Sequence, residues 1–241
     1  MLLALDTSTR YASVALADED RVVVSRAWHS AFNHTVELMP AVAQLLESRG
    51  LSAGGLAGVA VALGPGGFSA LRVGISAAKG LALVAKKPIV GVGTLDLEAH
   101  PYLESGVAVC ALLEAGRQEC ATALYGPDGV RLRADRVCTI EELLAEVTGD
   151  VSGEIPGPVI FCGEGVTAWW DQIAGELGAK AQIVRAVPAA RAWALAAIGR
   201  KKLAAGETSD LAALQPEYLR MPSIGAPKQR DRVTQGGRPG R

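Results

Sequence analysis

The sequence has few of the residues that bind metals or carry redox chemistry. It contains three histidines, no two of them four residues apart, and four cysteines, none in a Cys-x-x-Cys pair. Zinc sites and redox-active dithiols need those spacings, so we expect neither, and we expect the thiols to be reduced. There is no run of eighteen consecutive apolar residues, which disfavours a membrane span. Met1–Asp6 has no basic residue before its acid, so we expect a strand there rather than a signal peptide.

Composition and charge divide the chain into a globular body and a basic tail. Its 241 residues suffice for one or two domains, and 49% hydrophobic with 20% charged residues is typical of a globular protein with a sizeable core. From Arg220 onward there are six basic residues and one acid, which leaves 18 basic and 24 acidic residues in the rest of the chain. We predict that residues 222–241, which are also rich in glycine and proline, form a disordered tail.

Hydrophobic periodicity predicts a similar order of elements twice. In the first half we expect three strands, a helix, a strand, a helix and a strand, at residues 2–5, 12–17, 21–28, 34–49, 56–63, 69–86 and 89–92. In the second half we expect three strands, a helix, a strand and two helices, at residues 107–113, 119–125, 130–137, 140–147, 159–162, 166–177 and 189–205. This order predicts an α/β protein with mixed sheets and two domains, residues 1–104 and 105–221.

A glycine-rich segment joins the strand at 56–63 to the helix at 69–86. It reads Gly64-Pro65-Gly66-Gly67-Phe68-Ser69-Ala70-Leu71-Arg72-Val73-Gly74. The segment lacks the Gly-Lys-Ser/Thr end of a P-loop, and it also lacks the third glycine and the later acid of a dinucleotide fingerprint. We therefore interpret it as a tight turn that lets the strand and the helix approach closely, with a phosphate cradle as the alternative. Ser69 is the predicted N-cap of the helix.

Two of the predicted helices, 33–49 and 69–86, have more apolar surface than one sheet can cover. Small residues recur every four positions along the second helix, and a stripe of this kind permits close approach of another helix. We therefore predict a partner interface, with packing on the chain's own sheet as the alternative. The predicted interface residues are Leu38, Val42, Leu45, Leu71, Gly74, Ile75, Ala78 and Ala82.

Four segments, Leu3–Thr9, Asn33–Thr35 with Pro40, Gly64–Gly74 and Pro216–Arg220, resemble the TsaB family of bacterial tRNA threonylcarbamoyladenosine biosynthesis proteins. The glycine segment of that family usually reads Gly-Pro-Gly-Ser-Phe-Thr-Gly-Leu-Arg. This chain therefore differs at three positions, Gly67, Ser69 and Ala70. At the start of the second half the family tends to carry Asp-Ala-Arg, where this chain has Glu114-Ala115-Gly116-Arg117.

The resemblance implies the fold shared by actin, sugar kinases and heat-shock ATPases, with two ribonuclease H-like domains of which the second is reduced. It also implies a cytoplasmic subunit without catalytic residues, cofactor or metal, which supports a TsaD-type transferase acting on the adenosine beside the tRNA anticodon. TsaD holds its metal with His-x-x-x-His after the last strand of its first domain, and the matching positions here are Thr94 and Glu98.

Further partners follow from the same resemblance. They are a TsaE-type ATPase in the assembled complex and, indirectly, tRNA. The uncovered apolar surface of the two helices predicts a second copy of the chain when it is alone. The charge of the basic tail predicts a weak contribution to tRNA binding, with a solubilising or species-specific extension as the alternative. The resemblance implies no membrane partner.

An alternative function is suggested by Asp6, Thr7 and Ser8. In kinases of this fold an aspartate at the end of the first strand coordinates nucleotide-bound magnesium, so these three residues are a candidate vestigial nucleotide site. An ATP-dependent phosphotransferase of the sugar-kinase type is therefore the alternative function. The other interpretation is that the three side chains satisfy backbone groups of the turn. We expect His34 to be a helix-cap or interface residue and Glu37 to lie on a solvated helix face. We expect neither to be a catalyst.

Overall fold

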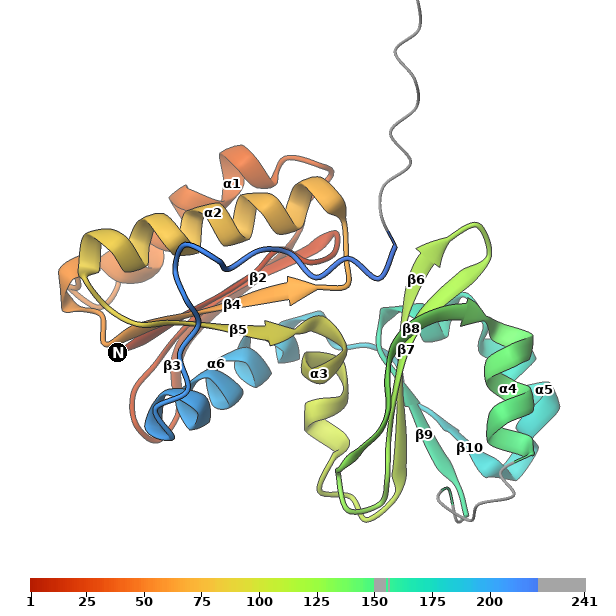
Figure 1. Cartoon of the computed structure of the whole chain (residues 1–241). Coiled ribbons are helices and arrows are strands. Elements are labelled where there is room, and N and C mark those ends of the chain that lie inside the picture. Colours follow the sequence, from red (N-terminus) through yellow and green to blue (C-terminus); the bar gives the residue numbers. More distant parts are fainter. Residues whose placement is uncertain (150–154, 156, 221–241) are drawn as a thin grey trace, which may run out of the picture.

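The computed structural model describes residues 1–149, 155 and 157–220, so the predicted tail, residues 222–241, lies outside the described residues. Figure 1 shows two α/β domains side by side, with the helices α3 (Thr94–Ala99) and α6 (Pro188–Ala204) near their junction. A short 3₁₀ helix, His100–Tyr102, continues α3 toward the second sheet.

The first sheet has five strands in the order β3-β2-β1-β4-β5. They are β1 (Leu2–Asp6), β2 (Tyr11–Ala17), β3 (Val22–His29), β4 (Gly58–Gly64) and β5 (Ile89–Gly93). The strand β2 is antiparallel to β1 and β3, whereas β4 is parallel to β1 and β5, so the sheet is mixed. Every residue of β1 and β4 is buried, which agrees with their continuous apolar sequence, because strands covered on both faces have no solvent side.

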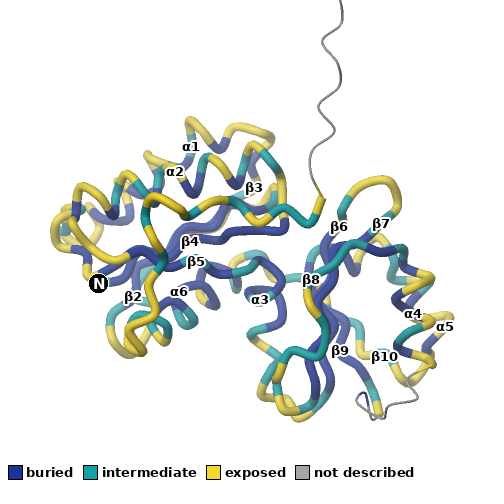
Figure 2. The backbone as a smooth tube through the Cα atoms, viewed as in Figure 1, coloured by how far each residue is buried: buried dark blue, intermediate teal, exposed yellow. Residues whose placement is uncertain are grey.

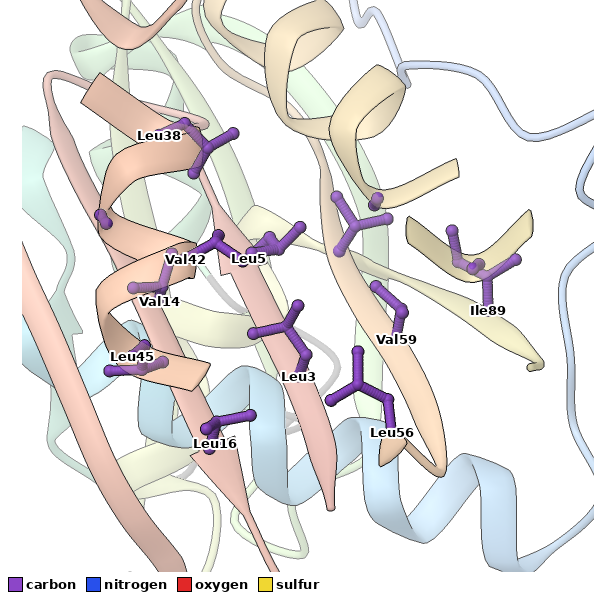
Figure 3. Packing of buried hydrophobic residues seen from close by; sticks show 14 of the residues in the cluster. Leu3, Leu5, Val14, Leu16, Leu38, Val42, Leu45, Leu56, Val59 and Ile89 are labelled. Carbon is purple, nitrogen blue, oxygen red and sulfur yellow. The ribbon is translucent and has the colours of Figure 1, made fainter. Parts of the chain in front are cut away.

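The helices α1 (His34–Glu47) and α2 (Phe68–Ala85) cover one face of this sheet. Figure 3 shows side chains of α1 directed at those of the strands, and this layer includes Leu38, Val42, Leu45, Leu5, Val14 and Leu16. Each of the six is at most 4% exposed. Full burial of one such side chain stabilises the fold by about 1.5–3 kcal/mol relative to exposure, so this layer is a main source of stability.

The helix α6 covers the opposite face of the first sheet, although the chain reaches it only after the whole second domain. Its buried side chains form one cluster with those of β1, β2, β4 and β5, including Ala192, Leu195, Ala4, Ala60 and Val90. A Cβ on Gly199 would lie 2.7 Å from the Cβ of Ala60, so the helix backbone rests directly on the sheet. Small residues on both sides make this close packing possible.

The described chain after α6 remains on the first domain. Ser209 forms a bridge with Ile89 at the outer edge of β5, and its amide donates to the Ile89 carbonyl oxygen at 2.8 Å. Lys79 of α2 donates to the carbonyl oxygens of Ala212 and Leu214 at 3.1 and 3.2 Å. This segment, residues 206–219, therefore covers an edge strand that would otherwise leave backbone groups unpaired.

The second sheet repeats the topology of the first, in the order β10-β9-β6-β7-β8. Its elements are β6 (Ala108–Gly116), β7 (Glu119–Tyr125), β8 (Arg131–Thr139), α4 (Ile140–Thr148), β9 (Val159–Cys162), α5 (Trp170–Leu177) and β10 (Ala181–Ile183). In both sheets the first strand is central, with two antiparallel strands on one side and two parallel strands on the other. This confirms the predicted fold class, two ribonuclease H-like domains of the actin-like type.

The second domain is the smaller of the two, as predicted. Its helices α4 and α5 have 9 and 8 residues, against 14 and 18 residues in α1 and α2. The other face of its sheet is covered by Leu95 and Ala99 of α3, together with partly buried residues that include Tyr102. Each domain therefore packs its last helix on the other domain: α3, which follows β5, lies on the second sheet, and α6, which follows β10, lies on the first.

Several predictions of local structure need correction. Residues 105–221 do not form one unit, because α6 and residues 206–219 pack on the first domain. The helix α2 begins at Phe68 with Gly67 as its N-cap, so Ser69 lies inside the first turn. The predicted helix 166–177 is divided into a 3₁₀ turn, Glu164–Thr167, and α5. The strand β10 was not predicted, because three residues are too few to show a period.

Two further observations concern the state of the cysteines and the surroundings of the helix α2. All four cysteines are free and buried. Within the described residues, α2 is the one helix whose length and composition alone would allow it to cross a membrane, and it packs on the sheet of its own domain.

The close packing of α6 predicts opposite effects for two glycine substitutions. Gly199→Ala should lower the free energy of unfolding by about 1–3 kcal/mol, because its methyl group meets that of Ala60. Gly80→Ala in α2, where no atom lies within 4 Å of an added Cβ, should raise it by about 0.5–1 kcal/mol through helix propensity. Urea unfolding of both variants is the measurement. Equal effects would contradict the contact between α6 and the sheet.

Candidate functional site

Asp6, the last residue of β1, lies at the junction between the two domains. Asp6 is fully buried, and its Oδ1 accepts hydrogen bonds from the backbone amide and the hydroxyl of Ser8 at 2.8 and 2.6 Å. Its Oδ2 accepts one from Nε of Arg191 at 2.6 Å. Thr7 donates its hydroxyl to the Ala70 carbonyl oxygen at 2.6 Å. All three residues of the predicted nucleotide site therefore bond to the chain itself, as the turn interpretation predicts.

Arg191, in the first turns of α6, is the charged centre of this junction. It is 1% exposed. Its Nη1 donates to Oε1 of Glu98 on α3 at 3.0 Å and also to Oε1 of Glu164, which belongs to the second domain. Its Nη2 donates to the hydroxyl of Thr9 at 2.8 Å and to a backbone carbonyl oxygen of β2. One guanidinium thus joins both domains and both crossing helices.

The pKa shifts at the junction follow from burial and from this pairing. Burial alone would lower the pKa of the Arg191 guanidinium, but the carboxylates of Asp6, Glu98 and Glu164 raise it above its ordinary value. Burial raises the pKa of the Glu98 carboxyl, against the opposing effect of Arg191. Arg191 therefore keeps its charge at every ordinary pH, while Glu98 takes up a proton more readily than an exposed glutamate.

The residues at this place do not fit the magnesium–nucleotide that the fold implies. Both carboxylate oxygens of Asp6 already accept bonds from the chain, and a guanidinium lies where a cation would have to approach. Thr94 is buried, and Glu98 is bonded to Arg191. In the part of the chain that the structure describes, no three His, Cys, Asp or Glu side chains are grouped so that they could hold a metal ion. The nucleotide role of Asp6, Thr7 and Ser8 stays a prediction.

The glycine-rich turn lies directly on the loop after β1. A Cβ on Gly66 would lie far inside van der Waals distance of the Ser8 carbonyl oxygen, and one on Gly74 would collide with the Thr7 hydroxyl. The amide of Gly67 donates to the same Ser8 oxygen at 2.8 Å. Because Gly67 itself has room for a Cβ, the serine of the resembled family would fit there. The segment is therefore a close-approach turn, and its glycines at 66 and 74 are required by their neighbours.

The segments that carried the resemblance meet around this turn. His34 is buried, with Nε2 3.0 Å from the Thr9 carbonyl oxygen, while the nearby Glu37 carboxylate accepts from the Trp28 indole. The amide of Glu217 donates to the Leu63 carbonyl oxygen at 2.8 Å. The ring of Tyr218 stacks on Phe68 with centroids 5.0 Å apart, and its hydroxyl accepts from Arg72 Nε.

The predicted interface residues lie on the inner faces of α1 and α2. All eight, Leu38, Val42, Leu45, Leu71, Gly74, Ile75, Ala78 and Ala82, are buried in the domain. Figure 2 shows the same division, with buried inner turns and exposed outer turns on both helices. The periodicity found both helices but selected the face that packs on the chain's own sheet. Their burial argues for packing within the domain, although Leu38 also lines the groove between the two helices. The interface and its residues stay a prediction.

The outer faces of the same helices expose a different set of apolar side chains. Val36 and Met39 of α1 are 70% and 44% exposed, and Leu83 and Val84 of α2 are 65% and 73% exposed. Between the helices lies an open groove of about 360 Å³ whose walls are mostly apolar, lined by Thr35, Leu38, Met39, Arg72, Val73, Ser76 and Ala77.

The sequence reasoning did not identify Arg191 or Glu164. One signal was available for the arginine, because it is the only charged residue in the otherwise apolar stretch from Val187 to Gly199. A single charge in such a stretch suggests a buried partner. Glu164 follows β9, whose counterpart in the first sheet is β4 rather than β1, so the internal repeat did not relate it to Asp6.

The glycine turn predicts different outcomes for two adjacent substitutions. Gly66→Ala should lower the free energy of unfolding by about 3 kcal/mol, because the methyl group meets a backbone oxygen that cannot move aside. Gly67→Ala should change it by less than about 1 kcal/mol, because its backbone angles suit alanine and the space is open. Thermal unfolding followed by circular dichroism distinguishes the two, and equal losses would show that the turn is not held by this contact.

The raised pKa of Glu98 predicts a pH-dependent stability difference between the wild type and Glu98→Gln. Asp6, Glu164 and Arg191 face this carboxyl. Between the ordinary value of 4.5 and the raised pKa, the folded chain holds a proton that the unfolded chain has released. The wild type should therefore gain stability relative to Glu98→Gln as the pH falls through the raised pKa toward 4.5. Urea titrations across this range measure the free energies of unfolding of both proteins, and a wild type that loses stability relative to Glu98→Gln on acidification would refute the shift.

Comparison with known proteins gives a consistent result. Residues 29–224 match the model of the family described as "TsaD: tRNA N6-adenosine threonylcarbamoyltransferase". The chain is 30% identical to the tRNA threonylcarbamoyladenosine biosynthesis protein TsaB of Bacillus subtilis, over 91% of this chain and 94% of that protein. It is also 30% identical to TsaB of Escherichia coli, with the same coverage. The solved structure of YeaZ from Pseudomonas aeruginosa superposes with a TM-score of 0.70 at 27% identity, covering 90% of this chain and 99% of that one.

Proposed function

This chain belongs to the TsaB family of tRNA threonylcarbamoyladenosine biosynthesis proteins, and from that premise we propose that it is a non-catalytic subunit that binds and supports a TsaD-type transferase. It thus has a part in the modification of tRNA. The proposal concerns what the chain contributes, namely a binding surface rather than a reaction.

The observation that carries the proposal is the exposed apolar outer face of α1 and α2. Val36, Met39, Leu83 and Val84 are all more than two-fifths exposed on these two helices, and Met39 also lines an open groove of about 360 Å³ between them. Apolar side chains gathered on one face are typical of a protein–protein interface. The occupant follows from the likeness of the two families: this chain matches the TsaD family model over residues 29–224, so a TsaD-type subunit has equivalent helices. Two such helix pairs can pack face to face about an approximate twofold axis.

The junction between the domains supports the non-catalytic part of the proposal. The positions that correspond to the metal-binding histidines of TsaD are Thr94 and Glu98, and Glu98 is bonded to Arg191. Asp6, on which a sugar-kinase type of phosphotransferase would depend, has no free carboxylate oxygen. We therefore do not favour the phosphotransferase.

Further partners are proposed from the family resemblance, the exposed apolar face and the charge of the tail. In the absence of a TsaD-type subunit, a second copy of the chain would cover the same apolar face. A TsaE-type ATPase would join the assembled complex, which we propose to be cytoplasmic. The six basic residues from Arg220 onward would contribute an electrostatic attraction to tRNA that weakens with salt.

The outer face of α1 predicts the effect of a single charge on partner binding. Met39→Glu should weaken the affinity for a TsaD-type subunit by at least about tenfold, because a buried unpaired charge costs more than about 1.4 kcal/mol. The fold should remain intact, because Met39 is 44% exposed. Isothermal titration of the purified chain with its TsaD-type homologue measures the affinity.

The matched control is Val130→Glu, which makes a similar change at a residue that is 59% exposed in the second domain. It should bind as the wild type does. The proposal fails if Met39→Glu binds with unchanged affinity, or if both variants lose binding equally.

A further inference from the structure

The guanidinium of Arg191 has every donor satisfied by its own chain. An arginine side chain carries five N–H groups. In this structure Nε bonds Asp6, Nη1 bonds Glu98 and Glu164, and Nη2 bonds the Thr9 hydroxyl and the Tyr11 carbonyl oxygen. No donor is left for a phosphate or a carboxylate ligand, so Arg191 is not an anion-binding residue.

The acceptors around Arg191 come from four separate parts of the fold. Asp6 ends β1 and Thr9 lies in the loop after it, Tyr11 begins β2, Glu98 lies on α3, and Glu164 opens the 3₁₀ turn of the second domain. Arg191 itself comes from α6, the helix that crosses back to the first sheet. The side chain therefore lies where the two crossing helices, the end of β1 with its loop, and the turn after β9 meet.

We propose that the guanidinium of Arg191 takes the place of a bound cation at the domain junction, so that the two domains are held together without metal or nucleotide. This proposal does not rest on the proposed partner or on the role in tRNA modification. It accounts for the misfit between the residues at this junction and the magnesium–nucleotide that the fold implies.

The electrostatic argument is one of compensation. Three carboxylates close to one another and largely removed from water repel each other, and each loses its hydration. They persist only if a cation or protons offset that cost. Arg191 supplies one positive charge in a planar group that bonds all three at once. The raised pKa of Glu98 indicates that one of the carboxylates is readily neutralised by a proton as well.

The same geometry disfavours a divalent cation in the wild-type chain. A magnesium ion prefers six oxygen ligands in near-octahedral positions, and its carboxylate ligands must present free lone pairs. Asp6 has given both oxygens to donors, and Glu164 and Glu98 both present Oε1 to the same Nη1. A cation could enter only by displacing the guanidinium. The three carboxylates are not grouped as metal ligands in the wild-type arrangement of the described residues. Removing the Arg191 side chain, by contrast, leaves them without a counter-charge, so they would have to rearrange around a hard cation to offset their repulsion.

The test is the thermal unfolding of the full chain with and without Mn²⁺ or Mg²⁺–ATP at millimolar concentration. The Tm of the wild type should not respond to either addition. Arg191→Ala should lower the Tm by about 10 °C, since loss of one partner leaves buried charges unpaired. Mn²⁺ should then recover part of that loss, and calorimetric titration should detect Mn²⁺ binding to Arg191→Ala.

The matched control is Arg200→Ala, on the same helix, where the guanidinium donates to the carbonyl oxygens of Asp18 and Glu19. That variant should show a smaller loss in Tm and no response to Mn²⁺. If Arg191→Ala does not fold, Arg191→Lys replaces it in the test, because lysine keeps the charge with fewer and less directed donors. Arg191→Lys should unfold at a lower temperature than the wild type, and its Tm should not respond to Mn²⁺.

Three results would overturn the proposal. The first is a rise in the Tm of the wild type with Mn²⁺ or Mg²⁺–ATP that Asp6→Asn abolishes. The second is a loss in Arg191→Ala that Mn²⁺ does not reduce, which would make Arg191 a packing residue only. The third is an Arg191→Lys variant as stable as the wild type, which would show that the five bonds do not matter.

Discussion

The contact between the loop after β1 and the turn after β4 constrains the arrangement of the first domain more than any other. Gly66 and Gly74 let the backbone of the turn and the first turns of α2 lie against Ser8 and Thr7. That approach fixes the start of α2, and with it the surface on which Phe68 receives Tyr218 from the far end of the described chain. It also encloses the loop that carries Asp6 and Thr9 toward the second domain. The position of α2, the glycine-rich turn and the junction between the domains therefore all depend on this one close approach.

Much of the fold could be predicted from the sequence because local patterns carry it. The continuous apolar runs of β1 and β4 predicted strands at both places, and the structure buries both strands completely. The repeated order of elements predicted two domains of one topology, and the two sheets have equivalent strand orders. The glycine turn was also interpreted correctly, since the absence of P-loop and dinucleotide residues left close approach as the reason for its glycines.

What the sequence did not reveal depends on contacts between distant segments. The period of an alanine-rich helix such as α6 shows that it has an apolar face but not which sheet receives it, so its place on the first domain was missed. The same limit explains the interface residues. Leu38 and Ile75 belong to the strongest apolar stripe of their helices, and the strongest stripe is the one that a domain buries. The exposed residues that we propose for a partner, such as Val36 and Met39, lie on the weaker stripe.

The exchange of last helices has a consequence for the order in which the chain folds. One face of the first sheet, with Leu2, Ala4, Ala60 and Val90, is covered mainly by residues of α6, together with Leu97 of α3. During synthesis this face is exposed until the whole second domain has emerged, and closing it requires contacts between residues far apart in the sequence, which slow folding. The second domain, whose strands and paired helices are nearly contiguous, has no such delay on that account. The domain encoded first is therefore expected to be the one completed last.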